Sequence, residues 1–110
     1  MAVQLLNSDN LRGHIETFIL GVLLDGPKYG GEIRRIITKK TNGLYEPNEQ
    51  SLYSAYHRLE DLRLIRGSWG DEKVGATRKY YAITEEGRKV YESNKSKWQT
   101  IKQLIDILIG

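Results

Sequence analysis

Two tyrosines, a histidine and an arginine lie close together in SLYSAYHRLED, the stretch from residue 51 to residue 61. The apolar residues of this stretch have helical spacing, and at about 100° per residue they share one face of a helix. The opposite face is predicted to carry hydrogen-bonding side chains with few acids near its start: Gln50, Tyr53, Ser54 and His57. Such a face can enter the major groove of DNA and meet base edges and phosphates. The alternative is an ordinary surface helix that shows polar groups to water.

A second group of candidate residues is basic. Lys73 lies near the tip of a predicted hairpin, and Arg78 and Lys79 lie on its returning strand. Cations in these positions can bind the phosphates beside the groove that a recognition helix occupies. Taken alone, the same cluster also fits a solvated hairpin edge, which is the commoner role of a few surface charges.

Trp98 belongs to an apolar stripe near the end of the sequence. The members of the stripe are separated by steps of three and four residues, which is typical of a helix that packs against a partner helix. They are Tyr91, Asn94, Trp98, Ile101, Ile105 and Leu108. We therefore expect a homodimer held by this helix and by the first helix of the chain. Its interface is expected to include Leu11, Ile101, Ile105 and Leu108.

A two-fold axis through such a dimer would place Trp98 opposite its symmetry mate, where two indoles can flank a flat aromatic ligand. The first helix contributes polar residues, among them His14 and Thr17, that suit the wall of a partly solvated cavity better than a tight core. The simpler alternative is that Trp98 is a bulky residue of the dimer seam.

The composition excludes several kinds of chemistry. The chain has no cysteine, which removes disulfides, thiol nucleophiles and thiolate metal ligands together. Only two histidines are present, and no carboxylate is predicted to orient either of them. We expect neither an enzyme nor a metal or cofactor site. The pair Gly30-Gly31 lacks the strand and the lysine of a phosphate-binding loop and is interpreted as a turn.

The size and charge of the chain indicate one small basic domain. It has 110 residues and a net charge of +3, and the positive charge is concentrated between Lys28 and Lys40. No apolar run approaches the roughly 20 residues needed to cross a membrane. The first residues lack the basic region and the cleavage-like site of a secretory signal. We therefore expect a cytoplasmic protein without a membrane partner.

Cap and turn residues divide the chain into three helices, a hairpin and a long closing helix. The first helix is predicted from Leu11 to Asp25-Gly26-Pro27, the second from Ile33 to Thr41-Asn42-Gly43, and the third from Asn48 to Leu62. Two strands are predicted at 65–69 and 78–83, and Thr84 is the predicted cap of the last helix. This order predicts a mainly α fold with a small β hairpin, which is a winged helix-turn-helix with a long C-terminal dimerisation helix. Residues 1–83 would form the DNA-binding region and 84–110 the dimerisation helix, together in one compact domain.

Three stretches of the chain resemble a known family: ILGVLLDGPKYGGEI at 19–33, LYSAYHRLEDLRLI at 52–65 and GATRKYYAITEEGR at 75–88. They resemble the signature regions of the PadR family of transcriptional regulators, and the short chain resembles the small single-domain branch of that family. The resemblance implies a winged-helix homodimer that represses promoters. It places Tyr53 at the DNA surface and Arg58 in an Arg-Leu-Glu sequence of the recognition helix, so Arg58 joins the candidate DNA-binding residues.

The chain departs from the family pattern at two positions. Gly31 stands where an aromatic residue is common, in a region where a DNA or packing contact is expected. Arg63 stands where the family usually has glycine at the end of the third helix. The second departure implies either a different cap or a slightly longer recognition helix.

Small-branch members with a tryptophan at the position of Trp98 imply a repressor that is relieved by planar aromatic, often cationic, compounds. We therefore expect a sequence-specific DNA-binding homodimer that represses transcription and is relieved by a ligand at its dimer interface. The competing class is a protein-interaction module that uses the same fold and a coiled-coil helix without contacting DNA. Affinity for double-stranded operator DNA separates the two classes.

Overall fold

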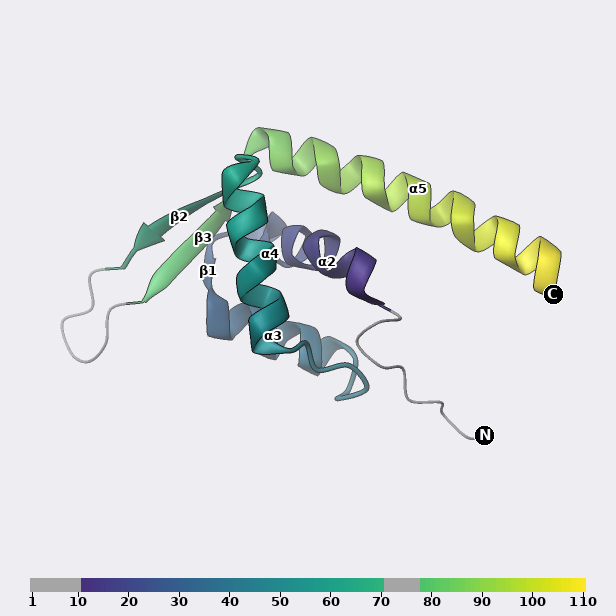
Figure 1. The fold of residues 1–110 in the computed structure, drawn as a ribbon, viewed down its shortest axis with the longest axis horizontal. Coiled ribbons are helices and arrows are strands. Elements are labelled where there is room, and N and C mark those ends of the chain that lie inside the picture. Colours follow the sequence, from purple (N-terminus) through teal and green to yellow (C-terminus); the bar gives the residue numbers. More distant parts are fainter. Residues whose placement is uncertain (1–10, 71–77) are drawn as a thin grey trace.

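The computed structural model of the chain describes residues 11–70 and 78–110 (Figure 1). Three helices form the body, a small antiparallel sheet lies at one side of it, and the last helix extends well past the body. In chain order the elements are the 3-10 helix η1 (Arg12–His14), α2 (Ile15–Val22), the 3-10 helix η2 (Leu23–Asp25), β1 (Lys28–Tyr29), α3 (Gly30–Lys40), α4 (Glu49–Asp61), β2 (Ile65–Trp69), β3 (Lys79–Ile83) and α5 (Glu85–Ile109). The predicted fold class is confirmed.

Helix α2 lies at the centre of the hydrophobic core. It packs against α3, α4 and α5, and its residues Ile19 and Leu20 are fully buried. Contact on several sides explains why the helix is apolar over most of its surface. The other buried core residues are Ile15, Val22, Leu23, Ile33, Ile37, Leu52, Ala55, Tyr56, Leu59, Ile65 and Tyr81.

The first predicted helix is correct in place but wrong in its bounds. The 3-10 turns η1 and η2 flank α2, so the α-helix itself has only 8 residues. The 3-10 helix η2 is capped by Gly26, which has a φ of 144°. Glycine adopts this backbone conformation readily, whereas other residues are strained in it. The predicted stop before Pro27 is therefore confirmed, whereas a continuous α-helix from Leu11 is not.

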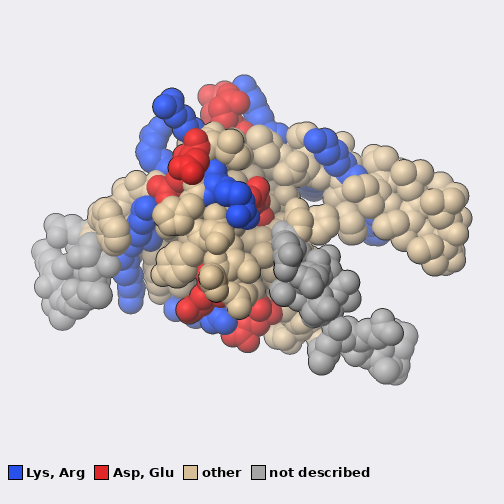
Figure 2. Space-filling model, in the orientation of Figure 1, with Lys and Arg blue, Asp and Glu red and all other residues tan. Residues whose placement is uncertain are grey.

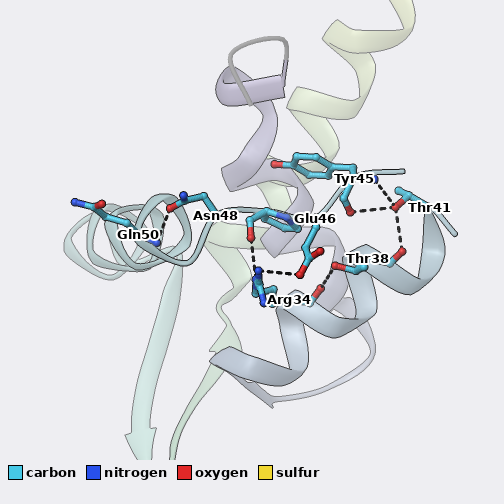
Figure 3. A network of polar contacts seen from close by, with 8 residues as sticks. Arg34, Thr38, Thr41, Tyr45, Glu46, Asn48 and Gln50 are labelled. Atoms are coloured by element: carbon cyan, nitrogen blue, oxygen red, sulfur yellow. Dashed lines mark hydrogen bonds and ion pairs between the residues drawn. The ribbon is translucent and has the colours of Figure 1, made fainter. Parts of the chain in front are cut away.

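A network of polar contacts fixes the loop between α3 and α4 (Figure 3). Arg34 of α3 donates from Nε to the carbonyl of Pro47 at 2.8 Å and forms an ion pair with Glu46 at 2.9 Å. The hydroxyl of Thr41 accepts from the backbone N–H of Tyr45 at 3.1 Å. These contacts tie both ends of the loop to α3, so they determine where α4 begins.

The predicted caps on either side of this loop are both present. Asn42 adopts a left-handed φ of 52°, and the N–H of Gly43 donates to the carbonyl of Thr38 at 2.9 Å, which closes α3 in a Schellman motif. The side chain of Asn48 accepts from the backbone N–H of Gln50 at 2.8 Å, which opens α4 as the predicted N-cap.

Helix α4 ends in a second Schellman motif, and this explains the family departure at Arg63. Arg63 takes a left-handed φ of 61°, and the N–H of Leu64 donates to the carbonyl of Leu59 at 2.9 Å. Arg63 forms the left-handed cap for which glycine is the usual residue, so neither of the two predicted alternatives, a different cap or a longer helix, is present. Leu62, the predicted end of the third helix, follows the last residue of α4 and is 63% exposed. The left-handed turn directs Leu64 to the core instead.

The sheet has three strands in the order β1-β3-β2, with both pairs antiparallel. The predicted hairpin of β2 and β3 is confirmed, but a two-stranded sheet is wrong because Lys28 and Tyr29 pair with Tyr81 and Tyr80 on the outer side of β3. A two-residue strand is too short to show alternation in a sequence. It leads directly into α3, so Gly30-Gly31 begins a helix and the interpretation of this pair as a turn is wrong.

Helix α5 starts against the end of α4. The hydroxyl oxygen of Thr84 accepts from the N–H of Gly87 at 3.0 Å, so the predicted cap is confirmed. A Cβ atom on Gly87 would lie 2.1 Å from the carbonyl oxygen of Leu64, which shows how closely the two backbones approach. The boundary proposed between residues 83 and 84 falls at this joint. Within the described ranges, no helix combines the length and the apolar character needed to span a membrane.

Gly87→Ala is expected to destabilise the fold, because the added methyl group would overlap the Leu64 carbonyl and one of the two backbones must move. Overpacking of this kind costs about 1–3 kcal/mol of the free energy of unfolding. Urea unfolding at one protein concentration measures the loss. The control is Ser93→Ala on the exposed side of the same helix, which is expected to stay within about 0.5 kcal/mol of the parent. A Gly87→Ala protein as stable as the parent would contradict the close approach.

Candidate functional site

The face of α4 that points away from the core carries the four side chains predicted from the sequence. Gln50, Tyr53, Ser54 and His57 are all exposed, and Tyr53 is exposed to 62%. The opposite face, which includes Leu52, is buried. The predicted division of the helix into an apolar and a hydrogen-bonding side is confirmed, and the exposed side offers an amide, two hydroxyls and an imidazole on one surface.

Two buried tyrosines hold α4 in place. The ring of Tyr56 stacks on that of Tyr81 with centroids 4.6 Å apart, and its hydroxyl donates to the carbonyl of Gly30 at 3.2 Å. Burial raises the pKa of Tyr56 well above its usual value and raises the pKa of Tyr81 to about 12. Both are core aromatics. Tyr53 makes an edge contact with Tyr56 at 6.2 Å, so the exposed ring rests on the buried one.

Arg58 is turned toward α2. Its Nε–H donates to the carboxylate of Glu16, and the ion pair links the two helices. The side chain of Arg58 is 56% exposed. It borders the outward face of α4 but is not one of the four side chains that form this face. A role of Arg58 in contacting DNA stays a prediction.

The three predicted wing residues have different surroundings. The guanidinium of Arg78 lies 4.4 Å from the ring centroid of Tyr29, and its side chain is exposed. The ammonium group of Lys79 forms an ion pair with Glu60 of α4 at 3.0 Å, and less than a third of either side chain is exposed. Lys73 lies outside the described residues. Figure 2 shows further Lys and Arg side chains on the side of the molecule that carries the sheet.

A tyrosine flanked by two arginines lies beside the sheet and is not apparent from the sequence. Arg35 of α3 donates to the hydroxyl of Tyr29 at 2.6 Å, and this hydrogen bond raises the pKa of Arg35. Arg78, the residue before β3, approaches the same ring. Tyr29 belongs to the strand β1, which periodicity cannot detect. In the sequence, the one indication of this role is that Tyr29 lies between the basic residue Lys28 and the start of α3.

A groove of about 720 Å³ lies between α2 and α5 and contains the three predicted ligand residues. His14, Thr17 and Trp98 line it together with Phe18. The imidazole of His14 meets the indole of Trp98 edge to face, with 5.2 Å between ring centroids. The side-chain amide of Asn94 donates to the hydroxyl of Thr17 at 3.0 Å and joins the two walls. The structure therefore brings these residues into one site, while ligand binding itself stays a prediction.

Three of the four predicted dimer residues lie along the outer part of α5, and Leu11 lies just before η1. Leu11 and Ile101 border the groove. Ile101 and Ile105 are each exposed to 44% and Leu108 to 81%. The far end of α5 shows almost no charge on the face seen in Figure 2. Apolar surface of this kind is typical of sites of association, and dimer formation through it stays a prediction.

The described residues hold no cluster of three or more His, Cys, Asp or Glu side chains that could bind a metal ion. The candidate surfaces present hydrogen-bonding side chains on α4, cations beside the sheet, and aromatic rings in the groove. Groups of these kinds can bind a partner by non-covalent contacts.

Comparison with known proteins gives one family and close structural relatives. The model of the transcriptional regulator PadR-like family matches residues 19–93, well over half of the chain. A relative from Lysinibacillus sphaericus, described as uncharacterized protein X, is 34% identical over 96% of both chains. The structure of a transcriptional regulator from Clostridium thermocellum is 39% identical, covers 96% of this chain and 99% of its own, and superposes with a TM-score of 0.87.

A PadR from Bacillus subtilis, solved in complex with operator DNA, shares the fold at greater distance. It is 19% identical, and the match covers 72% of this chain and 45% of that chain with a TM-score of 0.65. The likeness confirms the winged helix-turn-helix architecture that the elements of this chain form.

Proposed function

The chain belongs to the PadR-like family of transcriptional regulators, and from this premise we propose that it binds operator DNA as a homodimer and represses transcription. Proteins of this family are regulators of transcription and not enzymes. The observation that carries the proposal is the exposed hydrogen-bonding face of α4 in a winged helix-turn-helix, because the second helix of that motif enters the major groove. The operator DNA bound to the more distant Bacillus subtilis PadR supports the same mode of binding.

In the proposed complex, α4 reads bases and the wing holds the backbone. Gln50, Ser54 and His57 face base edges, and the hydroxyl of Tyr53 contacts a phosphate or a base. The positive N-terminal end of α4 approaches the phosphates, while the side chain of Asn48 caps the N–H groups of Gln50 and Ser51. Lys73, Arg78 and Lys79 belong to the wing, and Arg78 has the most accessible charge of the two that the structure describes.

The proposed dimer uses the outer part of α5. Ile101, Ile105 and Leu108 form a row along this helix, and their exposed apolar surface supports association with a second copy. Leu11 borders the same side of the molecule. A dimer would place two α4 helices on one side for successive major grooves, which lie roughly 34 Å apart.

A planar aromatic ligand is proposed to relieve repression from the groove between α2 and α5. The supporting observation is that His14, Thr17 and Trp98 line one hollow that adjoins the apolar row of α5. In the dimer, Trp98 would face its symmetry mate. A bound ligand would favour a spacing of the two α4 helices that no longer matches the DNA, so ligand and operator would compete by a shift of populations.

Removing the hydroxyl group of Tyr53 is expected to weaken DNA binding without affecting the fold. Tyr53→Phe should cost about 1 kcal/mol of binding free energy for an operator selected from genomic fragments, because a hydrogen bond is lost. Ser54→Ala and His57→Ala should change the ranking of operator variants, since their side chains meet base edges. Affinity and melting temperature are measured for each variant. A large drop in melting temperature with unchanged affinity would show that this face packs inside the protein.

Arg78→Gln is expected to weaken binding to all duplexes alike and to lower the slope of log affinity against log salt by about 1. Lys79→Gln is the matched control. The ammonium group of Lys79 is already paired with Glu60, so fewer counterions should be released through this lysine on DNA binding than through Arg78. Its salt slope should change less than that of Arg78→Gln. A change in sequence preference with an unaltered salt slope would make Arg78 a base reader or a bystander.

Ile101→Asp with Ile105→Asp is expected to give monomers by light scattering, because two carboxylates would be buried at the proposed seam. The control is Gln103→Asp with Ile107→Asp, which has the same spacing on another face of α5 and should remain a dimer. A dimer that persists in the first variant would refute the assignment of the interface.

A further inference from the structure

Two guanidinium groups lie around the ring of Tyr29. Arg35 donates to the tyrosine hydroxyl at 2.6 Å, and its guanidinium carbon lies 5.4 Å from the ring centroid. The guanidinium carbon of Arg78 lies 4.4 Å from the same centroid. Both arginines are exposed, and within residues 11–70 and 78–110 no carboxylate forms an ion pair with either of them. Two exposed guanidinium groups this close together, without an acid paired to them, can bind a phosphate.

This cluster adjoins the exposed face of α4 through Gly31. A Cβ atom on Gly31 would lie 3.3 Å from a ring carbon of Tyr29. On its other side Gly31 lines a small hollow of about 80 Å³ together with Tyr53 of α4. Arg34 and Glu49 also line the hollow, so their charges offset one another there. The positive charge next to the face of α4 therefore comes from the two arginines at Tyr29.

Building on the proposed binding of operator DNA, we infer that Arg35 and Tyr29 contact the DNA backbone in addition to α4 and the wing. The guanidinium of Arg35 is a planar fork of donors that matches phosphate oxygens. The hydroxyl of Tyr29 accepts one bond from Arg35 and can donate its own proton to a phosphate oxygen. Phosphates follow one another at roughly 3.4 Å along the axis of a DNA strand, so a strand bound by Arg78 also brings phosphates to Arg35.

The glycine at position 31 makes room for this arrangement. An aromatic residue, which the family pattern has there, would place its Cβ atom 3.3 Å from the Tyr29 ring, closer than ordinary van der Waals contact. The ring would have to shift, and the hydrogen bond between its hydroxyl and Arg35 depends on where the ring lies. In this chain, the DNA contact expected near position 31 is therefore made by Tyr29 and Arg35.

Arg35→Gln is expected to lower the slope of log affinity against log salt by about 1. Binding to a selected operator should weaken about eightfold at roughly 0.1 M salt, since one phosphate contact contributes a slope of about 0.9. Arg35→Lys keeps the charge and should keep the slope. The control is Lys40→Gln, which removes the same charge from the other end of α3 and should stay within about twofold of the parent in affinity. Equal slopes for Arg35→Gln and Lys40→Gln would overturn the inference.

Tyr29→Phe separates positioning from charge. The change removes the acceptor that fixes Arg35 and leaves the charge in place. The salt slope should therefore stay near that of the parent, while affinity falls about threefold at every salt concentration, because a mobile arginine must be ordered on binding. The melting temperature is measured alongside, and it should stay close to the parent value because the ring is retained. Parental affinity in Tyr29→Phe would remove Tyr29 from the contact.

Ethylation of single phosphates in the operator duplex identifies the contact itself. Binding of the parent should be blocked by ethylation at a phosphate to which Arg35→Gln is no longer sensitive. Identical interference patterns for the parent and Arg35→Gln would contradict the inference.

The results separate this inference from the proposed function. If Arg78→Gln shows its expected loss of slope while Arg35→Gln behaves like the control, this inference is wrong and the proposed function stands. If the parent prefers no selected duplex over random DNA, the proposed function is wrong, and this inference is wrong with it.

Discussion

The side chain of Arg34 holds the two helices of the helix-turn-helix in register. It connects α3 to the carbonyl of Pro47 at 2.8 Å and to Glu46 at 2.9 Å, just before α4 begins. Pro47 is fully buried, so the loop is held by packing as well as by a charge-assisted hydrogen bond. Because this loop orients α4, the direction of its hydrogen-bonding face depends on the contact. The tyrosine stack beneath α4 then supports the helix along its length.

The start of α5 links this recognition unit to the rest of the molecule. The backbone N–H of Thr84 donates to the carbonyl of Leu64 at 3.0 Å, and its hydroxyl donates to the carbonyl of Arg63 at 2.8 Å. Because Gly87 has no side chain, α5 can lie close to the backbone of Leu64. These contacts join the end of α4 to the beginning of α5. Under the proposed function, a ligand that changes the tilt of α5 in the dimer would change the spacing of the two α4 helices through this joint.

Elements with local signals could be predicted from the sequence, and features that depend on distant contacts could not. Asn48 and Thr84 mark helix starts because their side chains bind N–H groups two or three residues away. Strand β1 has no local signal because Tyr29 is held by β3, far along the chain. The ion pair of Lys79 with Glu60 also joins distant segments and changes the expected role of that lysine. Helical spacing placed His14 and Thr17 on one face of the first helix, whereas the packing of α2 against α5 that brings Trp98 beside them is a contact between distant segments.

Protection of guanine N7 from methylation tests most directly whether α4 occupies the major groove, since N7 is an acceptor on the floor of that groove. Dimethyl sulfate is applied to a selected operator duplex with and without the protein. The account predicts protected guanines in two patches about one helical turn apart, one for each α4 of a dimer. Tight binding that leaves every guanine N7 in the duplex open to methylation would contradict the account, as would the absence of any selected duplex with higher affinity than random DNA.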